Sequence, residues 1–524
     1  MDTKKQTSKK EKDEIIKLYS SGELNKAKSK IKKFLEKFPS DPVLYNLLGA
    51  VLNEENNPDQ AIINYKKALQ IKPNYAAAHN NLGISLHKFD KSDEAIKSYM
   101  EAIKFNSNFA QAYNNLAVLY KEKNKFDEAT LHCKKALEIK PDFPEAHNNL
   151  GTIFESTDKL NEAIICYQKA IKFRPNYPEA YNNIGVALKC LGQFDEAIIN
   201  YQKAIKLRPY YPEAESNESF VRLLLGQFEI GWKKYEYRLK KKNKKLKHQS
   251  ILLWNGKDSI KGKKILIWSE QGLGDCIQFS RFINKIIKTE AKITLEVQKN
   301  LQSLMTLISD KINITTNVNP NDDFDFQIPL TSLASIYKIN LQNMSSNNPY
   351  LTIPEELITK WSKKLGLQKK PRIGLAWSGD KNYKHDKYRS LKLKKILPII
   401  SKKFDFFCLQ KDIRDEDMID FNNSSIKYFG NQDFLNTGAI IKNLDLVISA
   451  DTSILHLSGS LNFPTWGLIN FSPDWRWIIG RNDTPWYPSV KLFRQNEISK
   501  WEKIVDQVKK ELNSKIFKNN LQTE

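Results

Sequence analysis

The sequence contains no apolar run near the roughly 18 consecutive residues that a membrane-spanning helix requires. Its lysine-rich start is followed by no hydrophobic stretch of the kind that forms a secretory signal peptide. Integral membrane proteins are therefore not among the expected classes, and we expect a soluble, cytoplasmic protein with no transmembrane segment.

Cysteine is scarce, with five residues in a chain of 524. The cysteines lie far apart, with neither paired metal-ligand spacing nor the density of a disulfide framework. We expect reduced thiols packed in the core at Cys133, Cys166, Cys190, Cys276 and Cys408.

Acidic residues are outnumbered, since 83 lysines and arginines face 60 aspartates and glutamates and leave a formal charge of +23. The lysines are spread along the whole chain and mixed with acidic residues at helical spacing, so the charge does not predict a nucleic-acid partner. One dense basic run extends from Leu239 to His248. It favours a solvated linker, placed at residues 240–262, over a specific anion or membrane-surface patch.

A period of 34 residues is present in three separate columns of the sequence. Prolines form one column, which has Ser107 in its single gap, and glycines form another, which has Ala117 in its gap. The columns are Pro39, Pro73, Pro141, Pro175 and Pro209; Gly49, Gly83, Gly151 and Gly185; and Ala27, Ala61, Ala95, Ala129, Ala163 and Ala197.

Each column has a physical reason in a stack of helical hairpins. Small residues let the two helices of a hairpin approach closely, and proline ends the second helix because it lacks a backbone donor. The period is that of tetratricopeptide repeats, which stack into a superhelix with a concave inner wall. We place this superhelix at residues 11–239. Its last unit departs from the pattern at Glu218 and Ser219, as an end or docking repeat would.

Beyond the repeats, short β-rich apolar runs alternate with helix-like stretches, which predicts parallel sheets with helical crossovers. We assign two Rossmann-like halves, at residues 263–367 and 371–496, and a C-terminal helix at 497–512. The predicted strands are Ile265–Trp268, Ile293–Val297, Ile312–Thr315, Phe326–Pro329, Ile373–Trp377, Phe404–Leu409, Leu444–Ser449 and Pro464–Leu468.

Ligands of such folds bind beyond the carboxyl ends of the strands, so the loops there are the candidate site. The first loop contains Gly272 and Gly274, which allow a tight turn, and Asp275 at the expected start of a helix. A carboxylate at that position either caps the helix or faces the cleft.

A later loop places Asp451, Thr452 and Ser453 at the start of another expected helix, and His456 follows one turn later. The free N–H groups and positive dipole end of a helix suit a phosphate or sugar hydroxyls. Helix capping by Asp451 or Thr452 is the alternative, although capping does not account for an imidazole in an otherwise apolar helix.

These motifs resemble the GT-B glycosyltransferases of the ADP-heptose:lipopolysaccharide heptosyltransferase family. The resemblance extends over about residues 253–494 and is sharpest in the Asp-Thr-x-x-x-His element that begins at Asp451. The whole layout is similar to bacterial proteins that join tetratricopeptide repeats to such a transferase.

The resemblance implies a role for each matching residue. Asp275 matches the proposed catalytic base, and Asp451, Thr452 and His456 match the element that binds the donor sugar and diphosphate. Ser453 stands where the family usually has glycine, and Gly274 belongs to the first loop. For the basic residue that holds the donor phosphates, Arg389 is the first choice, since its planar fork can bind a diphosphate bidentately, and Lys387 is the second. Lys384 and His385 belong to the same stretch.

An aromatic and arginine-rich segment near the end has two interpretations. In one interpretation, its aromatic side chains stack on a base or sugar ring of a ligand. In the other, the segment is a loop packed in the core. Its members are Trp475, Arg476, Trp477, Arg481, Trp486 and Tyr487. The motif Asp323-Phe-Asp325 resembles a metal-binding pair, but it borders a predicted strand without further ligands, so we expect no essential metal and no cofactor.

An asparagine column accompanies the repeats at Asn81, Asn115, Asn149 and Asn183. It resembles the inner lining of the repeats in protein O-GlcNAc transferases, where amides bind a peptide backbone without reading its sequence. The alternative is amides bonded within the stack.

Taken together, these features predict a metal-independent glycosyltransferase. It would move a sugar from a nucleotide-sugar to a protein or peptide acceptor held by the repeats. The alternative is a non-catalytic repeat scaffold or a nucleotide-sugar-binding adaptor.

Overall fold

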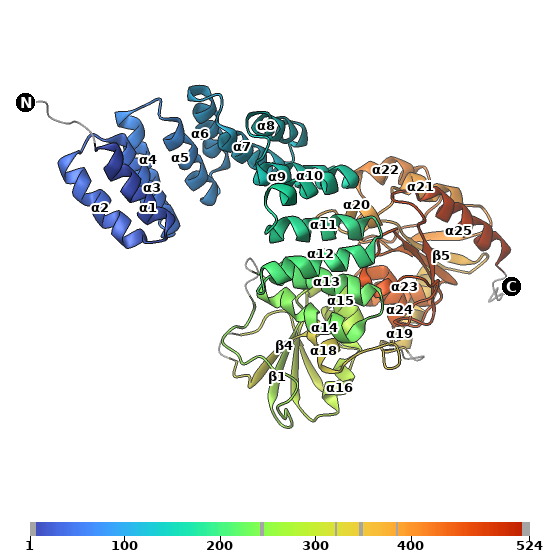
Figure 1. Ribbon diagram of the computed structural model, residues 1–524. Coiled ribbons are helices and arrows are strands. Elements are labelled where there is room, and N and C mark those ends of the chain that lie inside the picture. Colours follow the sequence, from blue (N-terminus) through green and yellow to red (C-terminus); the bar gives the residue numbers. More distant parts are fainter. Residues whose placement is uncertain (1–6, 242–245, 320–321, 345–348, 384–385, 516–524) are drawn as a thin grey trace, which may run out of the picture. The chain divides into compact units, whose positions relative to one another are not determined.

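The computed structural model describes residues 7–241, 246–319, 322–344, 349–383 and 386–515 (Figure 1). The chain divides into two compact units, the first made of residues 1–188 and 206–208 and the second of residues 189–205 and 209–524.

The first unit is a succession of helical hairpins (Figure 1). Its helices are α1 (Lys9–Ser20), α2 (Leu24–Lys37), α3 (Pro42–Glu54), α4 (Pro58–Ile71), α5 (Ala76–Lys88), α6 (Ser92–Phe105), α7 (Ala110–Glu122), α8 (Phe126–Ile139), α9 (Pro144–Ser156), α10 (Leu160–Phe173) and α11 (Pro178–Cys190).

The small-residue columns lie where the two helices of a hairpin meet. A Cβ added to Gly83 would lie 2.6 Å from the Tyr99 ring, and one added to Gly151 would lie 2.5 Å from the Tyr167 ring. Since carbon atoms do not approach so closely, glycine is what permits these tyrosines to pack. The alanines of the alanine column are fully buried.

The hairpins continue with α12 (Phe194–Leu207), α13 (Pro212–Leu224) and α14 (Phe228–Tyr235), followed by the 3-10 turn η1 (Glu236–Lys240). α13 and α14 belong to the second unit. Glu218 and Ser219, where the repeat pattern breaks, are fully buried there, and the Glu218 carboxylate pairs with Arg222 and Lys234. The departure from the pattern therefore marks a docked hairpin.

Two parallel sheets make up the α/β part of the second unit. The first has the order β3-β2-β1-β4 and the second β6-β5-β7-β8-β9. Their strands are β1 (Lys264–Trp268), β2 (Lys292–Glu296), β3 (Ile312–Thr315), β4 (Phe326–Pro329), β5 (Arg372–Ala376), β6 (Asp405–Cys408), β7 (Leu446–Ala450), β8 (Thr465–Ile469) and β9 (Val490–Arg494).

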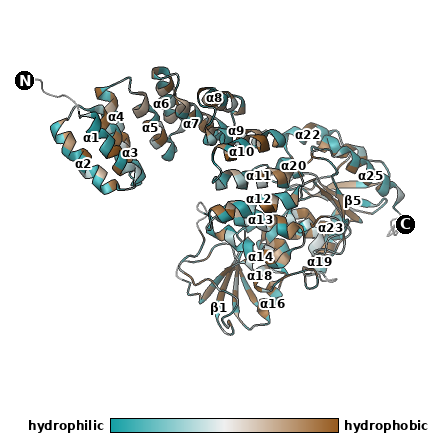
Figure 2. Cartoon of the chain, in the orientation of Figure 1, coloured by the Kyte–Doolittle hydropathy of each residue, from teal (hydrophilic) through white to brown (hydrophobic). Residues whose placement is uncertain are grey.

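The prediction of a parallel α/β region is confirmed, and each of the eight expected runs contains a strand. β9 escaped prediction because Val490–Arg494 carries a lysine and an arginine and follows an irregular segment rich in tryptophan and proline. β5 is mostly hydrophobic in Figure 2, in keeping with a strand buried on both faces.

Helices and 3-10 turns connect the strands, and a last helix follows β9. They are α15 (Leu273–Ser280), α16 (Ile283–Ile287), η2 (Lys299–Leu301), α17 (Gln302–Met305), η3 (Leu330–Ser332), α18 (Leu333–Ile336), α19 (Glu355–Leu365), α20 (Asp386–Arg389), α21 (Leu393–Ile396), η4 (Leu397–Ile399), α22 (Asp415–Asn422), α23 (Phe434–Lys442), α24 (Ser453–Ser460), η5 (Trp475–Trp477) and α25 (Glu502–Ser514).

Part of the segment assigned to a basic linker packs along the edge of the first sheet. Leu253 forms a parallel bridge to Gln327 on β4, the Trp254 N–H donates to the Gln327 carbonyl at 2.9 Å, and Trp254 and Ile260 are buried. These apolar residues pack on the sheet although lysines precede them. Residues 242–245 of the basic run lie outside the described residues.

Candidate functional site

The predicted site residues of the α/β region follow the carboxyl ends of their strands. Asp275 lies on α15 after β1, Arg389 on α20 after β5, and His456 on α24 after β7. A fourth loop, which contains η5, follows β8. Because the strands are parallel within each sheet, each of these loops lies at the carboxyl edge of its own sheet, where α/β folds bind ligands.

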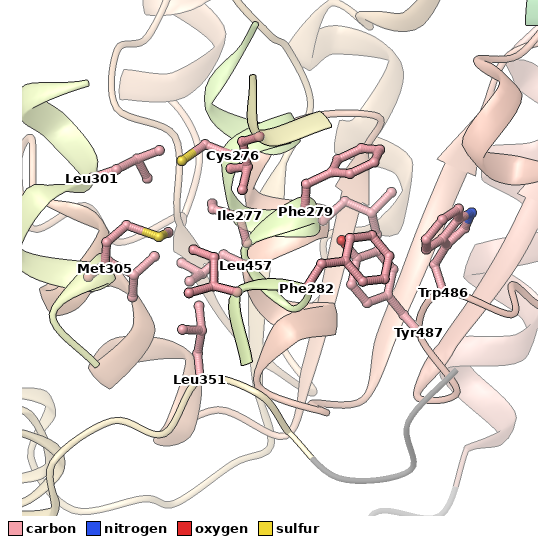
Figure 3. Close-up of a cluster of buried hydrophobic side chains, with 14 of the residues drawn as sticks. Cys276, Ile277, Phe279, Phe282, Leu301, Met305, Leu351, Leu457, Trp486 and Tyr487 are labelled. Carbon is pink, nitrogen blue, oxygen red and sulfur yellow. The ribbon is translucent and has the colours of Figure 1, made fainter. Parts of the chain in front are cut away.

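Helix α15 of the first half packs on helix α24 of the second half. The tightest point is Gly274, where an added Cβ would lie 2.5 Å from Cδ2 of the His456 ring. Cys276, Ile277, Phe279 and Phe282, on and just after α15, share a core with Leu457 of α24 (Figure 3). The two motifs that carry the family resemblance are thus in direct contact.

His456 is held in one orientation by aromatic neighbours. Its Nδ1 lies 2.9 Å from the Tyr487 hydroxyl, and its ring stacks on Trp477 with centroids 5.4 Å apart. Burial, with the nearby Arg281 and Arg389 guanidinium groups, lowers the pKa of His456 to about 3. The imidazole is therefore neutral at physiological pH, able to donate or accept one hydrogen bond at each nitrogen.

Asp275 caps its own helix and also contacts a buried arginine. Its Oδ2 accepts a hydrogen bond from the Gly272 N–H at 3.0 Å, and its Oδ1 pairs with the Arg476 guanidinium. About 16% of the side chain reaches solvent. The helix cap is therefore present, while the role of catalytic base remains a prediction.

The Asp451 motif forms the start of α24. Thr452 is the N-cap, and its Oγ1 accepts from the Ile454 N–H at 3.3 Å and lies 3.2 Å from the Ser449 hydroxyl. Asp451 is buried, which raises the pKa of its carboxyl, while Arg389 opposes the shift. Ser453 is the first residue of the helix and is partly exposed.

Arg389 connects α20 to this helix start. Its guanidinium donates to the Asp451 carbonyl at 3.0 Å, lies over the Tyr383 ring at 4.6 Å, and contacts the Asp386 carboxylate at 3.2 Å. Lys387 is exposed, and its ammonium lies over the Tyr388 ring. Arg389 therefore contacts the start of the Asp451 motif, while its role toward donor phosphates remains a prediction. Lys384 and His385 lie outside the described residues.

Asp474 is a neighbour that the sequence motifs did not single out. Although nearly a third of its side chain is exposed, desolvation by the surrounding protein and the Asp451 carboxylate raise the pKa of Asp474 to about 7. Its Oδ1 accepts from the Arg476 backbone N–H at 3.1 Å and pairs with the Arg476 side chain at 2.5 Å. In the sequence, Asp474 directly precedes Trp475-Arg476-Trp477, and this position was the signal that could have singled it out.

The aromatic segment packs in the core. Trp475, Trp477, Trp486 and Tyr487 are each at most 2% exposed. Figure 3 shows Trp486 and Tyr487 beside the side chains of α15. Among the described residues, the indole N–H of Trp486 and the Nε2 of buried Gln278 have no hydrogen-bond partner in the protein. Such donors are normally satisfied by water or a ligand.

The asparagine column of the repeats bonds within the stack. Asn81 donates to Asn46, Asn115 to Asn80, Asn149 to Asn114 and Asn183 to Asn148, each through Nδ2 at 2.9 to 3.0 Å. Each donating asparagine is partly exposed, while Asn80, Asn114 and Asn148 are buried. The amides therefore bond to one another within the stack, as the alternative interpretation expected. Binding of a peptide by the same amides stays a prediction.

The Asp323-Phe-Asp325 motif supports the sheet. The Asp325 carboxylate accepts from the Lys264 N–H at 2.8 Å at the start of β1 and pairs with Lys263. Within the described ranges, no three histidine, cysteine, aspartate or glutamate side chains lie together so that they could hold a metal ion. Nor does any helix in those ranges have the length and apolar character needed to cross a membrane.

Comparison with known proteins identifies the repeats. A family described as TPR repeat matches residues 49–88, 91–124 and 156–192, and one described as tetratricopeptide repeat matches residues 110–143 and 178–211. A curated relative, Protein FlbA of Caulobacter vibrioides, is 23% identical over 310 residues, covering 53% of this chain and 51% of FlbA. The chain thus spans about half the length of this relative.

Solved structures with similarity include the APC/C hetero-tetramer Cut9-Hcn1, with a TM-score of 0.41, 18% identity, and coverage of 44% of this chain and 46% of that chain. PilF of Pseudomonas aeruginosa has a TM-score of 0.36 and 20% identity, covering 39% and 94%. MamA has a TM-score of 0.28 and 26% identity, covering 31% and 95%. From the family matches and the 34-residue columns, this chain carries tetratricopeptide repeats.

Proposed function

We propose that the second unit is a GT-B glycosyltransferase that moves a sugar from a nucleotide-sugar to a protein or peptide acceptor recruited by the repeats. The observation that carries the proposal is the contact between Gly274 and His456, which joins the two halves. It brings the Asp275 loop and the Asp451 helix together at the carboxyl ends of parallel strands.

On the donor side, the proposal uses the start of α24 and Arg389. The free N–H groups of a helix start attract a diphosphate, and a guanidinium can bind one bidentately. Arg389 contacts the backbone of Asp451, so both sources of positive potential lie at one point. The buried, neutral His456 is suited to a hydrogen bond with a sugar hydroxyl or phosphate oxygen because it adds no further charge.

On the acceptor side, the proposal assigns Asp275 as the base. An acceptor hydroxyl would attack the anomeric carbon of the donor, the bond from that carbon to the diphosphate would break, and the nucleotide would leave. The proton of the hydroxyl would pass to the Asp275 carboxylate. With Oδ2 accepting from the Gly272 N–H and Oδ1 paired with Arg476, the carboxylate keeps lone pairs that can accept a proton, and 16% of the side chain is exposed.

Donor binding is tested by thermal shift with a panel of UDP-, ADP- and GDP-sugars. One member should stabilise the wild-type protein by mass action, by about 2.7 kcal/mol at a hundredfold excess over the dissociation constant. Arg389→Ala should lose this stabilisation. Arg481→Ala is the matched control, because Arg481 pairs with Asp483 on the surface.

A scaffold without catalytic activity is the competing function, since tetratricopeptide repeats are themselves partner-binding surfaces. Absence of stabilisation by every nucleotide-sugar would favour the scaffold. Stabilisation by one donor that is not consumed when acceptor is present would favour a nucleotide-sugar-binding adaptor.

A further inference from the structure

The last repeat hairpin shares its core with the α/β fold. Leu223 of α13 and Trp232 and Tyr235 of α14 are buried in the same cluster as Ile265 of β1 and Phe279 of α15. The Trp232 indole donates to the Ile339 carbonyl at 2.7 Å. The hairpin is thus an integral part of the second unit.

The turn after this hairpin forms hydrogen bonds with the loop that leads from β1 to Asp275. Arg238 is 3% exposed, and its Nε and Nη2 donate to the Glu270 carboxylate at 2.9 and 2.5 Å. Its Nη2 also donates to Thr331 and Ser332 at 2.8 and 2.7 Å. The next loop residue, Gln271, donates through Nε2 to the Tyr235 hydroxyl at 2.8 Å.

These bonds end one residue before the helix cap. Gln271 is followed by Gly272, the N-cap of α15, whose N–H donates to Asp275. The backbone carbonyl of Gln271 accepts from Gln298 at 2.6 Å, so the loop is held from two sides. The position of the Asp275 carboxylate therefore depends on where Glu270 and Gln271 are held.

A second set of contacts reaches Asp275 from the opposite direction. The Trp475 ring packs edge-on against Trp232 and Tyr235, at centroid distances of 5.2 and 6.0 Å. Its neighbour Arg476 pairs with Asp275 and lies over the Trp475 ring at 4.4 Å. Both partners of the Asp275–Arg476 pair are thus connected to the last hairpin and its turn through neighbouring residues.

We propose that Tyr235 and Arg238 are positioning residues, which hold the Glu270–Gln271 loop and thereby set the place of Asp275. The last hairpin then serves the active site directly, in addition to ending the repeat array. The catalytic consequence rests on the proposed glycosyl transfer, whereas the ordering of the loop does not.

Amide hydrogen exchange of the full-length protein tests the ordering of the loop. In Arg238→Lys, which keeps the charge but loses the planar fork, exchange of residues 269–276 should rise about tenfold or more. Tyr235→Phe should raise it less, since one neutral hydrogen bond is lost. Arg222→Lys is the control from the same hairpin, because Arg222 bonds to Glu218 and Gln227 and should leave the loop unchanged.

Gln271→Ala provides a variant from the loop side that leaves the hairpin core intact. It should raise exchange as Tyr235→Phe does, and the double variant should add little, because both remove the same bond. Unchanged exchange of residues 269–276 in the folded Arg238→Lys and Gln271→Ala proteins would overturn the proposal.

Kinetics separates positioning from general stability. Once a donor is known, Arg238→Lys should lower kcat by about tenfold to a hundredfold with little change in the donor KM, because misplacement of a reacting group reduces the chemical step. A fall in kcat no larger than that of Arg222→Lys would contradict positioning. Absence of turnover in the wild type would remove the glycosyltransferase assignment, and the exchange result would still decide the ordering.

Discussion

At the residue scale, a close contact between the two α/β halves involves the smallest side chain. Gly274 does not adopt a positive φ, so backbone conformation does not require glycine there. A glycine is needed because the His456 ring occupies the space that a Cβ would fill. His456 in turn is 5% exposed and packs against Trp477, Tyr487 and α15. A close approach of this kind explains two residues that local propensity alone would not select, a helical glycine and a histidine in an apolar helix.

Gly274→Ala should therefore strain the junction of the halves. The added methyl group meets the His456 ring, and overpacking of this kind costs about 1 to 3 kcal/mol of unfolding free energy. Denaturant unfolding measures the cost. In a His456→Ala background the ring is absent, so the same substitution should cost much less; an equal cost in both backgrounds would show that the ring is not the obstacle.

The pH dependence of His456 follows from its lowered pKa. Between pH 6.5 and about 3 the unfolded chain binds a proton at His456 that the folded protein does not, so stability is lost as pH falls through this window. The wild type should lose about 2 kcal/mol relative to His456→Gln between pH 7.5 and pH 5.

Asp474 changes stability with pH in the opposite direction. Its pKa is raised to about 7, so protonation of its carboxyl as pH falls favours the folded state. It is present in both proteins, so the difference between them isolates His456. Chemical denaturation at several pH values measures this difference, and a difference independent of pH would contradict the burial of a neutral imidazole.

At the element scale, periodicity was sufficient to find the repeats and eight of the nine strands in the described residues. The 34-residue columns located the small residues that face Tyr99 and Tyr167, and the apolar runs located eight strands, since both signals come from burial. The partners of the site were not predictable in this way. Arg476 and Asp275 lie 201 positions apart in the sequence, so their pairing depends on the packing of the two halves.

Removing an asparagine of the ladder also lowers the stability of the repeats, and any test of acceptor binding must take this into account. Asn149→Ala removes the donor to the buried Asn114 carbonyl oxygen, which should lower stability by about 1 to 3 kcal/mol. If the ladder also binds the acceptor, Asn115→Ala and Asn149→Ala should raise the acceptor KM while donor binding is retained. Asn108→Ala, in an exposed turn, is the control. Acceptor kinetics like those of the control would limit the ladder to a structural role.

At the scale of the whole molecule, the boundary of the α/β part lies inside the repeats. The break in the repeat pattern at Glu218 was visible in the sequence, but the partners of the hairpin, such as Ile339, are too distant in the chain to be foreseen. Residues 189–515 contain the docked hairpin, whereas a fragment from residue 240 would expose the surface that Trp232 and Tyr235 cover.

Two fragments test this boundary. Residues 189–515 should unfold in a cooperative transition, and residues 240–515 should be unstable or aggregate because a large apolar surface is uncovered. Circular dichroism and size-exclusion chromatography distinguish these outcomes. A cooperatively folded, monomeric 240–515 fragment would show that the hairpin is dispensable for the fold.

In the function we propose, sugar transfer depends on one carboxylate at the junction of the two halves. Asparagine at position 275 can still cap α15 through its side-chain oxygen, but it cannot take a proton from an acceptor hydroxyl. The most direct measurement is the rate of nucleotide release from the donor in the presence of acceptor, for the wild type and for Asp275→Asn. We expect Asp275→Asn to lower this rate about a hundredfold or more with donor binding retained. Near-normal turnover in Asp275→Asn would contradict the assignment of Asp275 as the base.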